Sequence, residues 1–381
     1  MEEVKRKWIY LDNNSTTPID KRVLDSMMPF LTNSFANANS THQFGIDSNK
    51  AIKIARQQVA TLIGAESHEM IFTSGATEAI NLALKGVVEQ YFVKGNHIIT
   101  VATEHAAVLD TCHYLERCGY EITYLSVKPN GLIDLNELKA ALRADTVLTT
   151  VMYVNNETGV IQPIKEIAQL THEVGALFIC DGTQAIGKIP VDVEALGIDL
   201  LAFSGHKFYA PKGVGALYIK KGIRLPPMIH GGGHERGLRS GTLNVPGIIA
   251  LGAASELAQK EMRYDAMRVG DLRDRLEQQL LQLPRAYVNG NTENRLYNVT
   301  NICFPGEDAN VIIGRLKTIA VSNGSACTAA IIEPSHVLQA MGLTDDDAYA
   351  SIRFSLGKFN TAEDIMTTAE ELKAIIQPNQ N

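Results

Sequence analysis

The 381-residue sequence has few cysteines, a single tryptophan, and no apolar run approaching the roughly 20 residues of a membrane-spanning helix. Its five cysteines are odd in number and form no C-x-x-C pair, so we expect free thiols instead of a disulfide framework. The first residues lack the apolar core of a secretory signal, which predicts a cytoplasmic protein. Long basic runs are absent too, and 35 Lys and Arg against 42 Asp and Glu give a net charge of −7. We therefore expect neither direct nucleic-acid binding nor a membrane surface as partner.

The composition is that of a folded globular protein, with 45% hydrophobic and 20% charged residues and enough length for more than one domain. From about residue 70 to residue 219, short apolar runs alternate with polar turns and helical stretches. This alternation predicts an α/β fold with a doubly wound, mostly parallel sheet. The predicted strands are 70–73, 97–101, 121–125, 149–154, 177–180, 200–203 and 215–219. Ligands of such sheets bind beyond the carboxyl ends of the strands.

A long helical pattern follows, bracketed by Pro246 and Pro284, and we interpret it as an interdomain helix. Beyond it, new strand-like runs and helices after Asp308 and Thr361 predict a smaller α+β domain. The predicted strands there are 285–288, 298–304, 319–322 and 351–355. The expected division is a large domain of residues 18–261 and a small domain of residues 262–381, joined by the N-terminal segment 1–17.

Residues that can take part in binding or catalysis follow three of the predicted strands. Small residues at 74–77 begin a predicted helix, which suits a phosphate group, although such a motif by itself is more often an ordinary helix cap. Asp181 can pair with a positive ring nitrogen or cap the next turn. Lys207 can form a Schiff base with a carbonyl cofactor or be a surface lysine. Together, a phosphate site, an anion and an amine are what pyridoxal phosphate requires.

Other motifs in the sequence fail on specific residues. Residues 182–188 fit the first seven positions of a P-loop, but Ile189 cannot bind magnesium and Pro190 stands where the helix should begin. His230 and His234 flank three glycines, so their spacing does not indicate a helical zinc pair. The HGGG string also resembles the oxyanion loop of esterases, but the chain has no G-x-S-x-G motif, which argues against a hydrolase. We expect no metal site.

A series of motifs runs along nearly the whole chain. In order they are LDNNSTTP, SGATEAINLA, TEHAAVLD, VNNETGVIQP, DGTQAIGKIPVD, FSGHKFYAPKGVGALY, HGGGHERGLRSGT, SNGSACT and SIRFSLG. The series resembles the NifS/IscS-like cysteine desulfurases, a branch of the class V group of fold type I pyridoxal-phosphate enzymes. The chain departs from the family pattern at Ala38, where proline is usual, and at Gly182 and Asn323, where alanine and serine are common.

The resemblance implies a role for each candidate residue. The catalytic residues would be Lys207, which binds the cofactor covalently, His105, which stacks on its ring, and Cys327, which accepts the sulfur. The cofactor would be pyridoxal 5'-phosphate, held by Asp181 at the ring nitrogen, Gln184 at the ring oxygen, and Ala76, Thr77, Ser204 and His206 at the phosphate. Thr242 would reach the phosphate of the neighbouring subunit, which implies a homodimer. Asn156 and Arg353 would hold the substrate carboxylate.

The function implied by the resemblance is conversion of L-cysteine to L-alanine, with the sulfur carried as a persulfide on Cys327 to an acceptor protein. Iron–sulfur cluster assembly, tRNA thiolation and DNA phosphorothioation are the alternative destinations of that sulfur. Two other functions compete with this one. One is a related class V enzyme such as a selenocysteine lyase or an aminotransferase, and the other is a non-catalytic sulfur-carrier partner that keeps only the fold.

Overall fold

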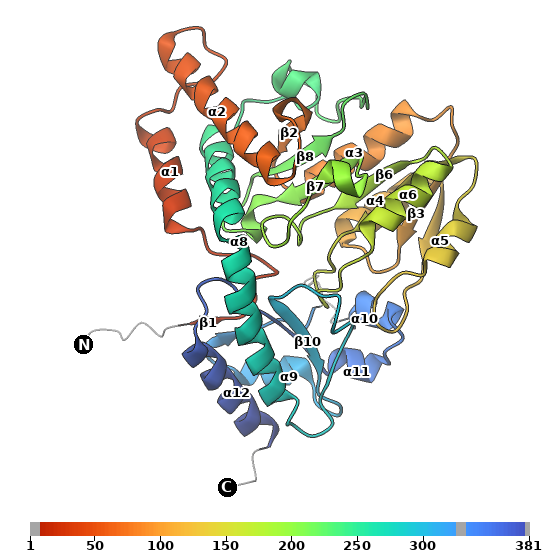
Figure 1. Cartoon of the computed structure of the whole chain (residues 1–381), viewed down its shortest axis with the longest axis vertical. Coiled ribbons are helices and arrows are strands. Elements are labelled where there is room, and N and C mark those ends of the chain that lie inside the picture. The colour runs from red at the N-terminus through yellow and green to blue at the C-terminus, as the bar shows by residue number, and fades with distance from the viewer. Residues whose placement is uncertain (1–7, 325–332, 378–381) are drawn as a thin grey trace.

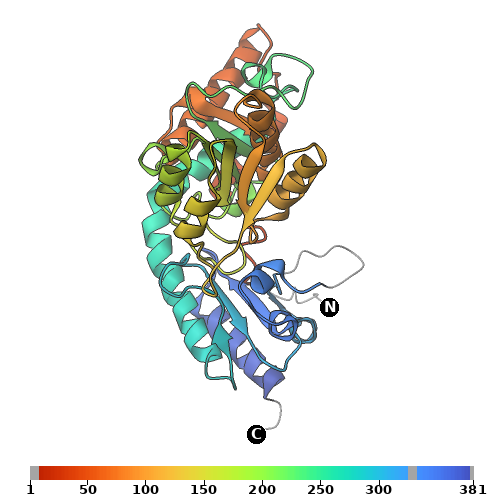
Figure 2. The ribbon, with the colours of Figure 1, turned by 90° about the vertical axis from the view of Figure 1, so that its right-hand side faces the viewer.

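The computed structural model describes residues 8–324 and 333–377 (Figures 1 and 2). Its largest sheet has seven strands in the order β2-β8-β7-β6-β5-β3-β4. Only β8 runs antiparallel to its neighbours, and the other strand pairs are parallel, so the predicted mostly parallel α/β sheet is confirmed. The strands are β2 (Met70–Thr73), β3 (His97–Val101), β4 (Glu121–Leu125), β5 (Thr146–Met152), β6 (Leu177–Asp181), β7 (Leu200–Ser204) and β8 (Gly215–Ile219).

Both faces of this sheet are buried, which explains why its strands are apolar almost throughout. Successive residues of a strand point to opposite faces, and Ile98 and Ile99 belong to two different hydrophobic clusters. The cluster with Ile98 includes residues of α3 and α4, and the cluster with Ile99 includes residues of α2, α6 and α8. The helices are α2 (Gln43–Leu62), α3 (Ala76–Gln90), α4 (Ala106–Arg117), α5 (Leu135–Ala141), α6 (Ile164–Glu173), α7 (Val193–Leu196) and α8 (Val245–Leu280).

Several strand boundaries differ from their predictions by one or two residues, and β5 differs most. β5 begins at Thr146 instead of residue 149, because Leu148 already pairs with Leu177 of β6. It ends at Met152, and Val154 forms an isolated bridge with Ile161 instead of extending the strand. The chain therefore leaves the sheet two residues earlier than predicted, at the edge where ligands bind.

A second, smaller sheet has three antiparallel strands in the order β12-β10-β9, beside a two-stranded pair of β1 and β11. The 36-residue helix α8 connects it to the large sheet, as Figure 1 shows. Early residues of α8 pack on the large core and α1 (Lys21–Thr32), whereas Val269, Leu272 and Leu276 belong to the smaller core. The elements here are β1 (Ile9–Tyr10), β9 (Tyr287–Val288), β10 (Val299–Cys303), β11 (Ile319–Ala320), β12 (Ser351–Ser355), α9 (Ala309–Arg315), α10 (His336–Ala340), α11 (Asp345–Tyr349) and α12 (Ala362–Ile376). The domain boundary at residue 262 stays a prediction.

The N-terminal segment touches both sheets. Ile9 pairs with Ile319 of β11, and Asp12 bridges to Ser355 of β12. A few residues later, the Thr17 N–H donates to the carbonyl of His206, which follows β7 of the large sheet. The segment therefore crosses from one sheet to the other beside the ends of the large sheet's strands. Within the residues that the structure describes, we find no helix both long and apolar enough to cross a membrane.

Candidate active site

A cavity of about 660 Å³ lies at the carboxyl ends of β2, β3, β5, β6 and β7. It is lined by most of the candidate residues, namely Ala76, Thr77, His105, Asn156, Asp181, Gln184, Ser204, His206, Lys207 and Arg353. Thr242 is exposed and is not among the lining residues. Cys327 lies outside the described residues, although Gly324, three positions before it, lines the cavity. The structure thus gathers ten of the twelve candidates around one cavity.

One wall of the cavity is the N-terminus of α3. Its N-cap residue is Gly75, and no side chain accepts a hydrogen bond from the first N–H groups, in contrast to α1, where Asp20 does so. A Cβ added at Gly215 of β8 would stand 2.7 Å from the Gly75 Cα, so glycine permits this close approach of the backbones. Unpaired N–H groups and the positive end of the helix dipole favour an anion here.

His206 also lines the cavity, and its imidazole is uncharged at neutral pH. Burial, followed by the charge of Lys207, lowers the pKa of His206 to about 4. Its Nδ1 lies 3.1 Å from the Thr16 hydroxyl oxygen. A neutral imidazole at neutral pH acts through hydrogen bonds and not through charge.

Asp181 and His105 stand at the ends of β6 and β3. The Asp181 side chain is buried, and its Oδ1 accepts a hydrogen bond from the Thr183 N–H at 2.9 Å. His105 is the N-cap of α4, and its Nδ1 accepts from the Ala107 N–H at 3.0 Å. Burial lowers the pKa of His105, so the ring is neutral, and the contact at Nδ1 assigns its proton to Nε2.

Lys207 is the last residue of the short 3₁₀ helix Gly205–Lys207, which directly follows β7. Its Nζ donates to the carbonyls of Asn14 and Ser15, at 2.8 and 2.7 Å. Burial and the charge of Arg353 lower the pKa of Lys207 to about 8, although Asp181 opposes this shift. A larger share of neutral amine makes the side chain a better nucleophile and base near neutral pH.

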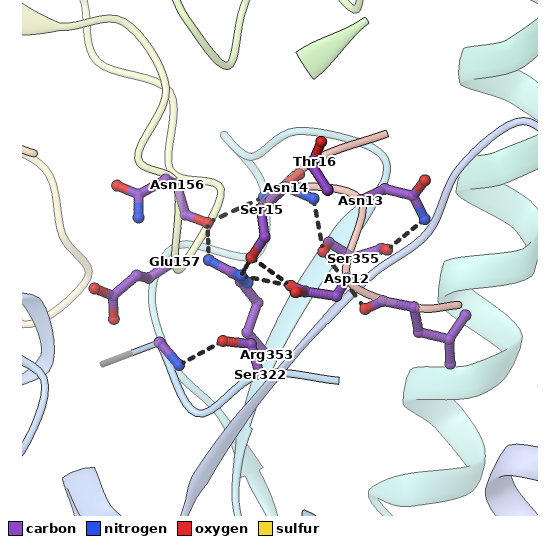
Figure 3. Close-up of polar contacts among 12 residues, drawn as sticks. Asp12, Asn13, Asn14, Ser15, Thr16, Asn156, Glu157, Ser322, Arg353 and Ser355 are labelled. Carbon is purple, nitrogen blue, oxygen red and sulfur yellow. Dashed lines mark hydrogen bonds and ion pairs between the residues drawn. The ribbon is translucent and has the colours of Figure 1, made fainter. Parts of the chain in front are cut away.

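Arg353 points from β12 into a group of N-terminal residues, shown in Figure 3. Its Nη2 donates to Asp12 Oδ1 and to the Ser15 hydroxyl, both at 2.6 Å, and its Nη1 donates to the Asn156 carbonyl at 3.1 Å. The Asn156 side chain points away from the guanidinium in Figure 3. Arg353 Nε is buried without a hydrogen-bond partner in the described part of the chain. The guanidinium therefore has capacity for another acceptor.

Asn14 is not among the candidates that the sequence indicates, yet it joins several of them. Its carbonyl accepts from both Lys207 and Gln184, the latter at 2.9 Å. Its side-chain amide donates to the Asn156 carbonyl at 3.1 Å, and its N–H donates to the Ser355 hydroxyl at 2.9 Å (Figure 3). The available signal is the polar motif LDNNSTTP, which follows an apolar strand just as the other site motifs do.

Comparison with known proteins decides the family. The family model described as aminotransferase class-V matches residues 9–367. The chain belongs to this family. Within it, a relative described as cysteine desulfurase IscS, from Pectobacterium carotovorum subsp. carotovorum, is 50% identical over 373 residues, which are 97% of this chain and 92% of the relative.

Similar solved structures agree with this assignment. A structure described as a NifS-like protein is 39% identical, with a TM-score of 0.92, and the match covers 97% of this chain and 99% of that one. A structure described as SspA in complex with cysteine is 37% identical, with a TM-score of 0.83 and coverage of 92% and 99%. The prediction of a NifS/IscS-like cysteine desulfurase is confirmed by these comparisons, and the chain is an enzyme of that branch.

Proposed function

We propose that this enzyme uses pyridoxal 5'-phosphate to remove sulfur from L-cysteine, releases L-alanine, and holds the sulfur as a persulfide on Cys327. The observation that carries the proposal is the shared cavity of Lys207, Asp181 and Arg353. An amine whose pKa is lowered to about 8 and a buried carboxylate stand at neighbouring strand ends, and a guanidinium stands on β12 of the smaller sheet. This set combines a nucleophile, an anion for a cationic ring and a partner for a carboxylate.

The described residues fit the proposed cofactor. A cavity of about 660 Å³ is of the size usual for small-ligand sites. The uncapped N-terminus of α3 and Ser204 suit the phosphate, and a hydroxyl of Thr183 is buried in the cavity wall without a partner among the described residues. When bound, the cofactor supplies an electron sink for the substrate Cα. In this proposal it is held by Ala76, Thr77, Asp181, Gln184, Ser204 and His206, and by Thr242 of the partner subunit.

Lys207 transfers the proton in this proposal, and His105 contacts the cofactor ring. We assign to Lys207 the removal of the substrate Cα proton, because its lowered pKa leaves a neutral fraction of the amine near neutral pH. His105 carries its proton on Nε2 and has Nδ1 occupied by the Ala107 N–H, so it can take up a further proton only by giving up that contact. This geometry supports stacking on the ring and hydrogen-bond donation more than it supports action as a base.

Arg353 receives the substrate carboxylate in this proposal. Its guanidinium already binds Asp12, so the substrate carboxylate either uses the unpaired Nε or replaces the Asp12 carboxylate. Charge neutralisation by Asp12 keeps the buried guanidinium paired until then, which avoids the cost of an unpaired buried charge.

The sulfur transfer requires the Cys327 thiolate. Its attack on the substrate sulfur forms a sulfur–sulfur bond and breaks the bond between that sulfur and the substrate Cβ. The electron pair of the broken bond stays on Cβ, which takes up a proton on the way to alanine. The products are L-alanine and a persulfide that passes its outer sulfur to an acceptor protein.

A homodimer in the cytoplasm is part of the same proposal. Thr242 is exposed and follows a loop that is tied to α3 by the ion pair of Arg239 with Glu78. Helices α1 and α2 and the turn between them also expose apolar side chains, which supports an interface there. These side chains are Leu24, Met28, Leu31, Phe35, Phe44, Ile46 and Ile54.

Product analysis tests the proposed function. The purified enzyme, supplied with pyridoxal phosphate, L-cysteine and a thiol reductant, is expected to release alanine and sulfide in equal amounts. Turnover of selenocysteine without turnover of cysteine would favour the selenocysteine lyase. Absence of a bound cofactor together with absence of turnover would favour the non-catalytic sulfur carrier.

The lowered pKa of Lys207 predicts the pH dependence of cofactor attachment. Only the neutral amine attacks an aldehyde, so the attachment rate of the cofactor-free enzyme is expected to rise about tenfold from pH 7 and level off above a midpoint near 8. Stopped-flow absorbance measures this rate, and a free lysine derivative corrects for ionisation of the cofactor.

A charge substitution provides the control for that profile. Arg353→Gln removes the neighbouring positive charge, so the pKa of Lys207 and the midpoint should both rise. Lys220→Ala should leave the midpoint unchanged, because Lys220 pairs with Asp199 and follows β8 at the amino ends of the parallel strands, away from the cavity. If the midpoint is unchanged or lower in Arg353→Gln, the charge of Arg353 is not a cause of the lowered pKa of Lys207.

A further inference from the structure

Lys188 is a buried lysine, only 5% exposed. Among the residues that the structure describes, no carboxylate lies within ion-pair distance of its Nζ, which contacts only the amide oxygens of Gln184 and Asn14. Burial, followed by the charges of Lys207 and Arg353, holds the pKa of Lys188 well below its usual range. Burying such a group costs stability, so its retention calls for a role that an apolar side chain would not perform.

The contacts of Lys188 point to Gln184. The Lys188 Nζ donates to Gln184 Oε1 at 2.6 Å and, at a longer 3.4 Å, to Asn14 Oδ1. Asn14 Oδ1 has a second donor in Asn298, whereas Lys188 is the one donor that the structure shows for Gln184 Oε1 within the described residues. Loss of the amine would therefore leave the Gln184 oxygen, and not the Asn14 oxygen, without a partner.

Two contacts together hold the Gln184 amide in one orientation. The Asn14 carbonyl can only accept a hydrogen bond, so it requires the amide nitrogen, and Lys188 donates to the amide oxygen on the other side. The amide nitrogen then donates one proton to the Asn14 carbonyl at 2.9 Å. Its second proton has no acceptor among the described residues, and Gln184 lines the cavity. The reversed amide would set nitrogen against the amine and oxygen against a carbonyl.

We propose that Lys188 is a positioning residue, which holds the Gln184 amide so that its nitrogen donates a hydrogen bond to the ring oxygen of the bound cofactor. This inference rests on the proposed function, because it assumes pyridoxal phosphate in the cavity. Lys188 contributes in two ways. It stabilises, together with the Asn14 carbonyl, the orientation of the amide, and donation at the amide oxygen polarises the group so that its N–H becomes a stronger donor.

A double-mutant cycle on cofactor binding tests this role. The cofactor-free forms of the wild type, Lys188→Met, Gln184→Ala and the double variant are titrated with pyridoxal phosphate, and absorbance gives the dissociation constant and the position of the cofactor band. Lys188→Met is expected to raise the dissociation constant about tenfold and to shift the band. In the Gln184→Ala background the same change should alter the dissociation constant less than about twofold, because the route through Gln184 is already lost.

Two further variants control for folding and charge. Lys188→Gln keeps an N–H donor on a shorter side chain and is expected to bind the cofactor with an affinity between those of wild type and Lys188→Met. Lys94→Met removes a lysine that donates to the Val174 carbonyl away from the cavity, and it should leave affinity and band unchanged. Thermal unfolding of each cofactor-free variant shows whether it is folded.

Two results would overturn the positioning role. In one, Lys188→Met weakens cofactor binding equally with and without Gln184. In the other, it leaves both the affinity and the band of the wild type unchanged. Failure of the wild type itself to bind pyridoxal phosphate would instead reject the proposed function, so the two failures are distinguishable.

Discussion

Replacing Lys207 with alanine is expected to lower the turnover of cysteine at least about a thousandfold and to abolish covalent attachment of the cofactor. The variant loses the only lysine amine that the described structure places among Asp181, His105 and Arg353 with a pKa lowered to about 8. The other cavity lysine, Lys212, follows Lys207 in the next loop and is exposed. It therefore lacks the buried surroundings of Lys207.

Borohydride reduction followed by peptide mapping measures the attachment site directly. The wild type should yield a reduced adduct on Lys207, and Lys207→Ala should yield none. Lys220→Ala removes an ion-paired lysine at the amino ends of the parallel strands, and this variant should retain both adduct and turnover. An adduct on another lysine of the wild type would overturn the assignment.

Replacing Cys327 with alanine is expected to separate cofactor binding from sulfur transfer. The cavity residues stay in place, so the variant should bind pyridoxal phosphate and become yellow like the wild type. It lacks the nucleophile that collects the substrate sulfur, so sulfide release should fall at least about a hundredfold. Absorbance spectra and sulfide assays on the same preparations test both halves of this prediction.

The remaining cysteines supply a matched control. Cys118 is exposed and lies at the end of α4, so Cys118→Ala should desulfurate cysteine at the wild-type rate. Cys112, Cys180 and Cys303 are buried, and burial raises the pKa of each thiol, which makes them poor nucleophiles. Persulfide found on Cys118, or normal sulfide release by Cys327→Ala, would contradict the role of Cys327.

The large sheet could be predicted from the sequence because its signal is local. A strand such as β3 is buried on both faces, so it appears as an apolar run bounded by polar turns. The rule that ligands bind at carboxyl ends of parallel strands then predicts Asp181 and Lys207 as site residues, because Asp181 directly follows an apolar run and Lys207 lies four residues after another. His105 also follows a strand, β3, but the sequence indicates its role only through the family resemblance.

Contacts between distant segments could not be predicted in this way. Asp12 and Arg353 are 341 positions apart, and no periodicity in either segment indicates that they meet. Asn14 belongs to a recognisable motif, but its role depends on carbonyl contacts, which leave no trace in the sequence. Lys188 stands out in the sequence only within a P-loop pattern that fails, because burial of a single lysine is a property of the folded chain.

The N-terminal segment also bears on how the protein is made. The Asn14 N–H donates to Ser355, and the Asn14 carbonyl accepts from Lys207, so this contact network joins segments that are 341 positions apart in the chain. Domains fold as they emerge, N-terminal part first, but this network cannot close until β12 has left the exit tunnel. A nascent chain that stalls before residue 353 has the lysine without the arginine. The described cavity residues therefore come together as a complete set only after β12 has been synthesised.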